Sequence, residues 1–308
     1  MPFQLTILGS GSATPTLQRN PTAQILQVEN DYYLIDCGEG TQTQILRYKL
    51  RPGRLKYIFI SHLHGDHYLG LIGLLMSLSL GKRTDDLYLF APAALAEIIT
   101  LQLKHSDSRL SYPLHFQVIE PDSHYHLFEN EQLSVATIPL QHRVPCSGFL
   151  FKEKPRKRKI IKEILPAEMS IEQIKQLKDG EDVLTENGQL LYANELYTQP
   201  APPVHTYAYC SDTNYNPSIV PIIRHANLLY HEATFSHNMK DWAAKTFHST
   251  AQQAAEIAHQ AQVGQLIIGH FSSRFKDVTP LLQEAQSVFP STLLAEEGKT
   301  YVVSDIVS

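Results

Sequence analysis

The sequence predicts an α/β protein built as a four-layer αββα sandwich, in which two mixed sheets pack face to face and helices cover their outer sides. Two features of the chain predict this class. Short apolar strands alternate with helices along the chain, and the strands that open each half have the pattern of antiparallel pairs. With 308 residues, 43% of them hydrophobic, the chain is long enough to bury such a core.

The first half of the chain opens with three strands, which are separated by Gly, Pro and Asn turns. Residues 55–61 form a fourth, buried strand by their β-branched and aromatic content, and they run directly into the sequence HLHGDH. The expected strands are 3–8, 22–28, 32–36 and 55–61, and the expected helices are 41–50, 69–80 and about 92–105.

The composition changes at residue 152. Residues 152–190 are rich in charge, poor in aromatic residues and interrupted by two prolines. We interpret them as an arm that is inserted into a single domain spanning residues 1–308 and protrudes from it. After the arm, the core continues with strands at 205–211, 227–233, 265–270 and 300–304 and with helices at about 249–262 and 277–289.

The charge of the chain limits how it can hold an acidic partner. The formal net charge is −5, so no global basic field attracts nucleic acid, and a polyanion must be held by local basic patches or bound cations. No apolar run is long enough to cross a membrane, and the N-terminus lacks the features of a secretion signal. Cys37, Cys146 and Cys210 form no CxxC pair, as is typical of reduced thiols. We therefore expect a cytoplasmic protein without membrane contact.

Four side chains that can bind metals lie within six residues. His62, His64, Asp66 and His67 follow a buried strand and precede a helix. On such a loop, His62 and His64 can face one metal ion while Asp66 and His67 face another. Imidazole and carboxylate ligands suit zinc, and also manganese where oxygen donors are numerous. A solvent-exposed histidine-rich turn is the alternative, but it would not require this order of residue types.

Three further candidate ligands follow later strands. His142, Asp212 and His270 each stand at the end of an apolar strand. Each alone is a weak signal, because a histidine at a strand end is more often a structural residue. Together they complete a site for two divalent metal ions, in which the carboxylate of Asp212 can bridge both. The sequence therefore predicts two divalent metal ions per subunit. Zinc is the expected metal, and manganese is the alternative.

This order of ligands resembles the metallo-β-lactamase superfamily, in which ligands at strand ends meet at one edge of an αββα sandwich. The resemblance implies a first metal held by His62, His64, His142 and Asp212. It implies a second metal held by Asp66, His67, His270 and Asp212. It also implies that Asp36, in the sequence LIDCGEG, supports the metal loop from outside the ligand shell. A turn carboxylate that caps the next helix is the alternative for Asp36.

Segments around the ligands resemble the tRNase Z family more specifically. They are GSGSATPTLQRNPTA near the N-terminus, HEATF at 231–235, FHSTAQQAAEIA at 247–258 and GHFSSRF at 269–275. The resemblance extends from Leu5 to about Pro290. It implies a two-metal endoribonuclease that cleaves the 3′ trailer from precursor tRNA. The tRNA would keep a 3′-hydroxyl, and the trailer would carry a 5′-phosphate.

The expected chemistry assigns roles to three residues. Asp66 would accept the proton of the attacking water, and His248 would donate a proton to the leaving 3′ oxygen. Glu232, at an adjacent strand end, would orient His248. A hydrogen-bonded pair that only braces the site is the alternative for Glu232 and His248, and the two interpretations are compatible.

Several residues are candidates for contact with RNA. Ser273 and Arg274 follow His270 closely enough to touch a phosphate or a neighbouring base, and a guanidinium can hold phosphate bidentately. Gly9 and Gly11 belong to a GSGS loop whose backbone amides can cradle phosphate, although such loops are common. Arg19, in the same loop, either contacts RNA or has a surface role.

The arm begins with a basic run. Seven Lys or Arg lie between residues 152 and 162 against one Glu, which is the composition that an RNA-binding arm needs in an acidic protein. Members of the tRNase Z family carry a flexible arm here that grips tRNA, and the resemblance also implies a homodimer. Helix 69–80 is a candidate dimer face, or equally part of the core. The candidate RNA contacts of the arm are Arg156, Lys157, Arg158 and Lys159.

Two other functions remain open from the sequence. One is a small-molecule hydrolase of the same fold that acts on a phosphodiester, a sulfate ester or a lactone; the HEAT and HST segments and the basic arm argue against it. The other is a non-catalytic RNA-binding subunit, and the complete set of candidate ligands argues against it.

Overall fold

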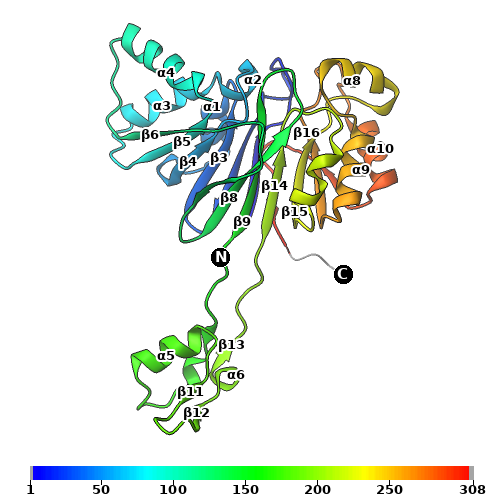
Figure 1. Ribbon diagram of the computed structural model, residues 1–308. Coiled ribbons are helices and arrows are strands. Elements are labelled where there is room, and N and C mark those ends of the chain that lie inside the picture. The colour runs from blue at the N-terminus through cyan, green and yellow to red at the C-terminus, as the bar shows by residue number, and fades with distance from the viewer. Residues whose placement is uncertain (1–2, 305–308) are drawn as a thin grey trace. The chain divides into compact units, whose positions relative to one another are not determined.

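The computed structural model describes residues 3–304, and two large sheets dominate it (Figure 1). The first sheet has seven strands in the order β18-β1-β2-β3-β4-β5-β6. Its pairs are antiparallel from β18 to β3 and parallel from β3 to β6, so the sheet is mixed. The strands are β1 (Phe3–Gly9), β2 (Ala23–Val28), β3 (Asp31–Cys37), β4 (Leu55–Phe59), β5 (Leu87–Ala91), β6 (Leu114–Val118) and β18 (Thr300–Val302).

The second sheet also has seven strands, in the order β17-β16-β15-β14-β9-β8-β7. It contains parallel pairs from β14 to β17 and an antiparallel pair between β7 and β8, so it is mixed as well. The strands are β7 (His126–Glu129), β8 (Leu133–Leu140), β9 (Cys146–Glu153), β14 (Thr206–Cys210), β15 (Leu228–Glu232), β16 (Gln265–Gly269) and β17 (Thr292–Leu294).

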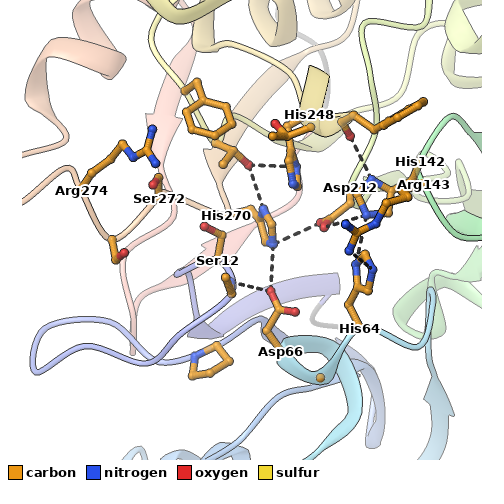
Figure 2. A pocket seen from close by; sticks show the side chains of 18 of the residues that line it. Ser12, His64, Asp66, His142, Arg143, Asp212, His248, His270, Ser272 and Arg274 are labelled. Carbon is orange, nitrogen blue, oxygen red and sulfur yellow. Dashed lines mark hydrogen bonds and ion pairs between the residues drawn. The ribbon is translucent and has the colours of Figure 1, made fainter. Parts of the chain in front are cut away.

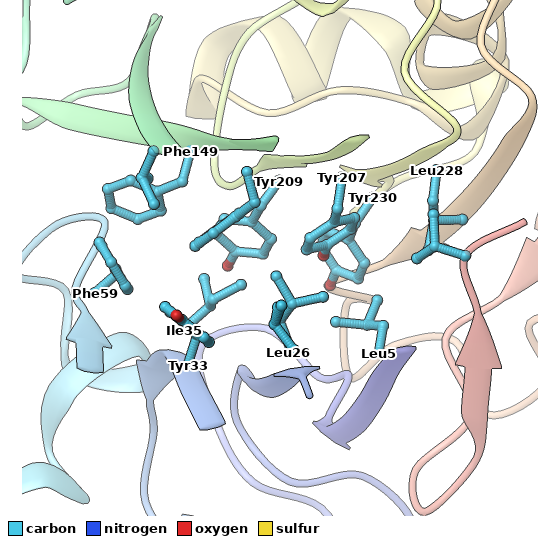
Figure 3. Packing of buried hydrophobic residues seen from close by; sticks show 14 of the residues in the cluster. Leu5, Leu26, Tyr33, Ile35, Phe59, Phe149, Tyr207, Tyr209, Leu228 and Tyr230 are labelled. Atoms are coloured by element: carbon cyan, nitrogen blue, oxygen red, sulfur yellow. The ribbon is translucent and has the colours of Figure 1, made fainter. Parts of the chain in front are cut away.

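The central core lies between the two sheets (Figure 3). Alternate side chains of each strand point inward, and these are large and apolar or aromatic. The ring of Phe59 stacks on Phe90 with centroids 4.6 Å apart, and the ring of Tyr209 stacks on Tyr230 at 5.2 Å. Figure 3 labels five buried residues of the first sheet: Leu5, Leu26, Tyr33, Ile35 and Phe59. The residues of the second sheet that face them are Phe149, Tyr207, Tyr209, Leu228 and Tyr230.

Helices cover the outer face of each sheet and bury two further apolar clusters. On the first sheet, three helices contribute to the cluster: α1 (Thr41–Arg47), α3 (Leu71–Leu80) and α4 (Ala94–His105). On the second sheet, α7 (Val220–Ile223), α9 (Ala251–Ala261) and α10 (Thr279–Val288) do so. The four layers are therefore helix, sheet, sheet and helix, as the sequence predicts. Two more helices, α2 (Gly65–Tyr68) and α8 (Lys240–Thr246), stand beside the site described below, and the short 3-10 helices of this part are η1 (Pro52–Arg54), η3 (Pro217–Ile219) and η4 (His237–Met239).

The expected elements of the sandwich occur within one to three residues of their predicted bounds. The helix expected over 69–80 is α3, which begins at Leu71, and the short helix α2, which ends at Tyr68, was not expected on the metal loop. Gly70 separates them because it packs directly on the loop after β3, where a Cβ atom would lie 2.1 Å from the carbonyl oxygen of Gly38. No helix of residues 3–304 is both long and apolar enough to span a membrane.

Residues Lys152–Val204 form a second compact unit with its own small core. The core consists of Met169, Leu177 and Val183, and a capping box of Ser170 and Gln173 starts its main helix. The unit begins where the arm was expected, but it extends to Val204 and not only to about residue 190. Its elements are β10 (Lys159–Ile160), η2 (Lys162–Ile164), α5 (Ile171–Lys178), β11 (Val183–Leu184), β12 (Leu190–Tyr192), α6 (Asn194–Tyr197) and β13 (Thr198–Gln199).

Candidate metal centre

The predicted ligands come from strand ends in both sheets and meet at one edge of the sandwich. The β4 strand leads into His62 and His64, and α2 carries Asp66 and His67. The remaining three follow strands of the second sheet: His142 after β8, Asp212 after β14 and His270 after β16. All seven side chains belong to two groups whose candidate ligand atoms lie within 4.8 Å of one another.

The first group surrounds one oxygen of Asp212. His64 Nδ1 lies 3.1 Å from both His62 Nε2 and His142 Nε2. Asp212 Oδ2 lies 3.7 Å from each of the same two Nε2 atoms. Two ligands of a tetrahedral zinc ion are themselves about 3.3–3.4 Å apart, because each sits about 2.0–2.1 Å from the metal. These spacings are therefore those of donor atoms arranged around one cation.

The second group surrounds the other oxygen of Asp212, and Figure 2 shows Asp66, His270 and Asp212 at this place. Asp212 Oδ1 lies 3.2 Å from His270 Nε2 and 3.4 Å from His67 Nε2. Asp66 Oδ2 lies 3.4 Å from His270 Nε2 and 3.5 Å from His67 Nε2. One carboxylate thus turns an oxygen toward each group, which is the arrangement of a bridging ligand.

Two buried atoms test whether metal ions fit here. Within residues 3–304, His67 Nε2 and Asp212 Oδ1 are buried and have no hydrogen-bond partner. Leaving such atoms unsatisfied is costly, so buried polar atoms are normally paired. Both atoms point at the space that the second group encloses, where a divalent cation would satisfy them. The His/Asp cluster can therefore hold divalent metal.

Hydrogen bonds outside the two groups fix the tautomers of four histidines. Asp36 accepts from His67 Nδ1 at 2.8 Å and from the Ser61 hydroxyl at 2.9 Å, and that hydroxyl lies 3.0 Å from His62 Nδ1. The other two histidines are bound in the same way at Nδ1: His142 donates to the carbonyl oxygen of Phe247 and His270 to the hydroxyl of Thr234, each at 2.9 Å. With Nδ1 protonated in each case, Nε2 keeps its lone pair for a metal.

Asp36 is thus the common anchor of the first loop. Its other oxygen accepts the backbone amide of Ser61 at 2.8 Å, and the oxygen that accepts His67 also accepts the hydroxyl of Tyr209 at 2.6 Å. Asp36 is fully buried and does not cap the following helix, whose N-cap position is Gly40. The contacts are those expected of a residue that supports the ligands.

Electrostatics prepare the cluster for cations. Burial lowers the pKa of His62, His64 and His142, which keeps these imidazoles neutral. Burial also opposes the charged form of His67, but the carboxylates of Asp212, Asp66 and Asp36 outweigh it and raise its pKa well above the usual value. A divalent cation would displace the proton that His67 carries among these carboxylates.

Glu232 and His248 form a buried ion pair beside the two groups. Glu232, at the end of β15, accepts His248 Nδ1 at 2.9 Å and is fully buried. Burial alone would lower the pKa of His248, but Glu232 outweighs it and raises that pKa to about 9. Glu232 also accepts the backbone amides of Thr213, Thr234 and Ser249, so the same carboxylate braces three segments.

A cavity of about 610 Å³ opens over the centre, and two of the predicted RNA contacts line it. Asp66, His248, Ser273 and Arg274 line it, and the guanidinium of Arg274 lies 5.4 Å from the ring centroid of Phe235. Arg19 is not among its lining residues. The Arg19 guanidinium instead donates to the backbone carbonyls of Ser272 and Phe275. The structure therefore places Arg19 behind the loop that carries Ser273 and Arg274.

The candidate RNA contacts of the arm lie in the second unit, and three of the four have local partners. Arg156 pairs with Glu153 at 2.7 Å, and Lys157 pairs with Asp179 at 2.5 Å. Arg158 donates to the hydroxyl of Thr198 at 2.7 Å. Lys159 is exposed on β10. The two lysines are the more exposed members of this set.

Sequence reasoning missed three residues of the centre. Thr234 belongs to the HEAT segment, and its hydroxyl joins Glu232 to His270. Arg143 lines the cavity, with Nη2 3.3 Å from His64 Nε2, and Phe247 accepts from His142. Arg143 and Phe247 directly adjoin His142 and His248 in the sequence, and that adjacency is the signal that could have indicated them.

Curated relatives match the chain over nearly its whole length. A ribonuclease Z of Cytophaga hutchinsonii is 49% identical over 308 residues, covering 100% of this chain and 98% of the relative. A ribonuclease Z of Parabacteroides distasonis is 45% identical over 297 residues, covering 96% of this chain and 97% of the relative. A family model described as anti-Pycsar protein Apyc1 matches residues 3–161, a span that ends before Asp212.

Solved structures share the fold. The crystal structure of human tRNase Z, short form (ELAC1), has a TM-score of 0.71 at 26% identity and covers 98% of this chain and 99% of that chain. The metallo-β-lactamase fold protein YhfI from Bacillus subtilis has a TM-score of 0.69 at 19% identity, covering 98% of this chain and 99% of that chain. The second likeness shows the fold alone. These matches confirm the predicted metallo-β-lactamase sandwich.

Proposed function

The chain belongs to the ribonuclease Z family and is an endoribonuclease that processes the 3′ end of precursor tRNA; from this premise we propose that it works with two divalent metal ions. We assign zinc to both sites, with manganese as the alternative. The products we propose are a tRNA with a 3′-hydroxyl and a trailer with a 5′-phosphate. The division of the Asp212 oxygens between two groups of donors is the observation that carries this proposal.

The ligand sets that we propose follow the two groups. His62, His64 and His142 would hold one ion, Asp66, His67 and His270 the other, and Asp212 both. When bound, two such ions supply positive charge that stabilises the phosphoryl oxygens and activates the attacking water. The protein's part is to orient the imidazoles of His67, His270 and His142, which Asp36, Thr234 and the carbonyl of Phe247 accomplish.

We propose that Asp66 and His248 move the protons. His67 and His270 hold the pKa of Asp66 well below its usual range against the effect of burial, so Asp66 is ionised and passes a proton from the water on to solvent. His248 is protonated at neutral pH and would donate to the leaving 3′ oxygen. Glu232 orients His248 through Nδ1, which leaves Nε2 as the donor.

We propose phosphate binding by Ser273 and Arg274, which line the cavity. For Arg19 we propose a positioning role in place of RNA contact, since its guanidinium supports the loop at Ser272 and Phe275. In the second unit, Lys157 and Lys159 are the candidates for phosphate contact because they are exposed, and Arg156 and Arg158 would reinforce them.

The assembly and location remain proposals that follow from family membership. We propose a homodimer in the cytoplasm, where tRNA is matured. Leu71, Leu74, Leu75 and Leu78 of α3 are buried in the apolar cluster on the first sheet. Leu80, at the end of the helix, is 80% exposed. The exposed end, and not the helix as a whole, is therefore available for contact with a second subunit.

End-labelled precursor tRNA tests the proposed function directly. We expect a single cut after the acceptor stem, abolished by a chelator and restored by zinc or manganese, with a 3′-hydroxyl on the tRNA. Asp212→Ala should remove the cut and lower the bound metal. A protein that holds two metals and hydrolyses a small phosphodiester, but leaves precursor tRNA intact, would contradict the proposal and favour a small-molecule hydrolase.

A further inference from the structure

Phe247 occupies a backbone position that favours glycine. It follows α8 with φ of 59° and ψ of 46°, in the left-handed region. The amide of His248 donates to the carbonyl of Ala243 at 2.9 Å, and the amide of Phe247 donates to that of Ala244 at 3.3 Å. This pair of bonds is the Schellman motif, whose left-handed residue is usually glycine because a Cβ atom is disfavoured there. Phe247 occupies this position although it carries a Cβ atom and a large side chain.

The backbone of Phe247 has a task that needs no side chain. Its carbonyl oxygen accepts Nδ1 of His142 at 2.9 Å and so orients a candidate metal ligand. Glycine would provide the same carbonyl in the same conformation. The orientation of His142 therefore does not explain the phenyl ring.

The ring stands at the boundary of two cavities. Phe247 is 39% exposed, and it lines both the cavity over the metal centre and a second cavity of about 440 Å³. The two cavities share His142, Arg143 and Phe247. Gln141 and Asn214 add polar groups to the second one. An exposed aromatic face beside polar groups is the composition of a site that stacks a nucleobase.

We propose that Phe247 is the platform on which the base of the tRNA's last nucleotide stacks, with that base directed toward the second cavity. The inference rests on the proposed function, in which His248 protonates the leaving 3′ oxygen. That oxygen belongs to the last nucleotide of the tRNA, and Phe247 is the residue bonded to His248. The base attached to the leaving oxygen is thus the one nearest the ring.

Stacking suits an enzyme that must accept every tRNA. Every base has a π face, so an aromatic platform binds all four without reading hydrogen bonds. Loss of one stacked base typically weakens binding by about 5- to 150-fold. The contact would hold the scissile phosphate in register while leaving the sequence at this position free.

A cycle of two enzymes and two substrates tests the proposal. The enzymes are the wild type and Phe247→Gly, which keeps the carbonyl and favours the left-handed backbone. The substrates are one precursor tRNA with the last base of the tRNA present or removed as an abasic site. We expect each single change to lower kcat/KM by about 5- to 150-fold and the two together to cost little more than one.

Matched controls separate stacking from structure. Phe247→Trp keeps an aromatic face and should keep the dependence of kcat/KM on the base. Trp242→Ala removes an exposed aromatic of the same helix that lines neither cavity, and it should leave that dependence intact. Phe247→Gly should keep its metal content and melt no lower than the wild type.

Three results would overturn the inference. The first is additive losses in the cycle, and the second is coupling of Phe247 to the first base of the trailer. The third is a lower melting temperature and metal content in Phe247→Gly, because that assigns the ring a structural role. If the wild type cleaves the intact precursor but shows any of these, only the inference fails; if it does not cleave at all, the proposed function fails with it.

Discussion

Buried carboxylates set the protonation of the histidines around the centre. Asp36 holds His67 by its Nδ1 proton, and Glu232 holds His248 in the same way. The two histidines have different roles because different side chains surround their Nε2 atoms. His67 faces Asp66 and Asp212 and suits a cation, whereas His248 faces the cavity and keeps a proton to donate.

His248→Ala should slow cleavage by roughly 10²–10⁴-fold and leave the metal bound. The pH profile of cleavage shows whether His248 acts in its protonated form. The pKa of His248 is raised to about 9, so the donor is protonated at neutral pH and is lost as the pH rises through that value. Bound cations oppose the imidazolium, so we expect the alkaline limb of kcat/KM at or below pH 9, and we expect it to be absent in the variant.

The control for this substitution is His259→Ala, which removes an exposed histidine of α9 outside the cavity. It should keep both the rate and the alkaline limb. Metal loss in His248→Ala would contradict its assignment as a proton donor, and so would an unchanged limb.

At the scale of elements, the junction of α2 and α3 positions half of the second ligand group. Asp66 and His67 lie on α2, which is one turn long and gains little stability from its own hydrogen bonds. Its position comes from packing. A Cβ atom added to Gly70 would lie 2.1 Å from the carbonyl oxygen of Gly38. A Cβ atom added to Gly38 would lie 2.4 Å from the carbonyl oxygen of Asp66.

Gly70→Ala should therefore destabilise the protein by about 1–3 kcal/mol or more, because the added methyl group meets backbone that cannot yield. Displacement of α2 should also lower metal content. Thermal unfolding and metal analysis of the purified variant measure both.

Gly73→Ala is the matched control, since it lies three residues further on in α3 and its Cβ would meet nothing closer than 3.4 Å. It should gain roughly 0.5–1 kcal/mol from helix propensity. If both substitutions had the same effect on stability, close packing at Gly70 would not be what positions α2.

At the scale of the whole molecule, charge is divided within the second unit. Residues 152–162 carry seven Lys or Arg against one Glu, whereas residues 163–195 carry eight Asp or Glu against two Lys. An acidic segment repels phosphate, so we expect RNA contact to be confined to the basic run. The unit has a small core of its own, formed by Met169, Leu177 and Val183.

Replacement of residues 152–204 by a short Gly-Ser linker should raise KM for precursor tRNA at least about 10-fold and spare hydrolysis of a small phosphodiester. The linker can be short because the strands at the two cut ends, β9 and β14, are neighbours in one sheet, about 4.8 Å apart. Kinetics on both substrates measure the effect.

Lys157→Ala with Lys159→Ala should reproduce part of this loss and reduce the salt dependence of tRNA binding, whereas Lys175→Ala in the acidic segment should not. Equal loss on tRNA and on the small phosphodiester would mean that the second unit supports the fold and does not bind RNA.

The sequence alone predicted the candidate ligands and the positions of most main strands along the chain. Local signals suffice for both: His62, His64, Asp66 and His67 are consecutive on one loop, and apolar runs that end in His142, Asp212 or His270 indicate strands by composition. Strand ends of such a sandwich gather at one edge, so the list already implied a site. The same local signals did not indicate α2, since a helix of one turn has little stability of its own and is held by the contact of Gly70 with Gly38, distant in the chain.

Tertiary structure decided the direction of individual side chains. The sequence places Arg19 in the same loop as Gly9 and Gly11, where it could contact RNA. Only packing turns its guanidinium toward Ser272 and Phe275 and away from the cavity. Only packing assigns the two Asp212 oxygens to different groups and exposes the ring of Phe247. The physical reason is the same in each case: the contacts join residues far apart in the chain, and their free energies depend on distances that composition and spacing do not contain.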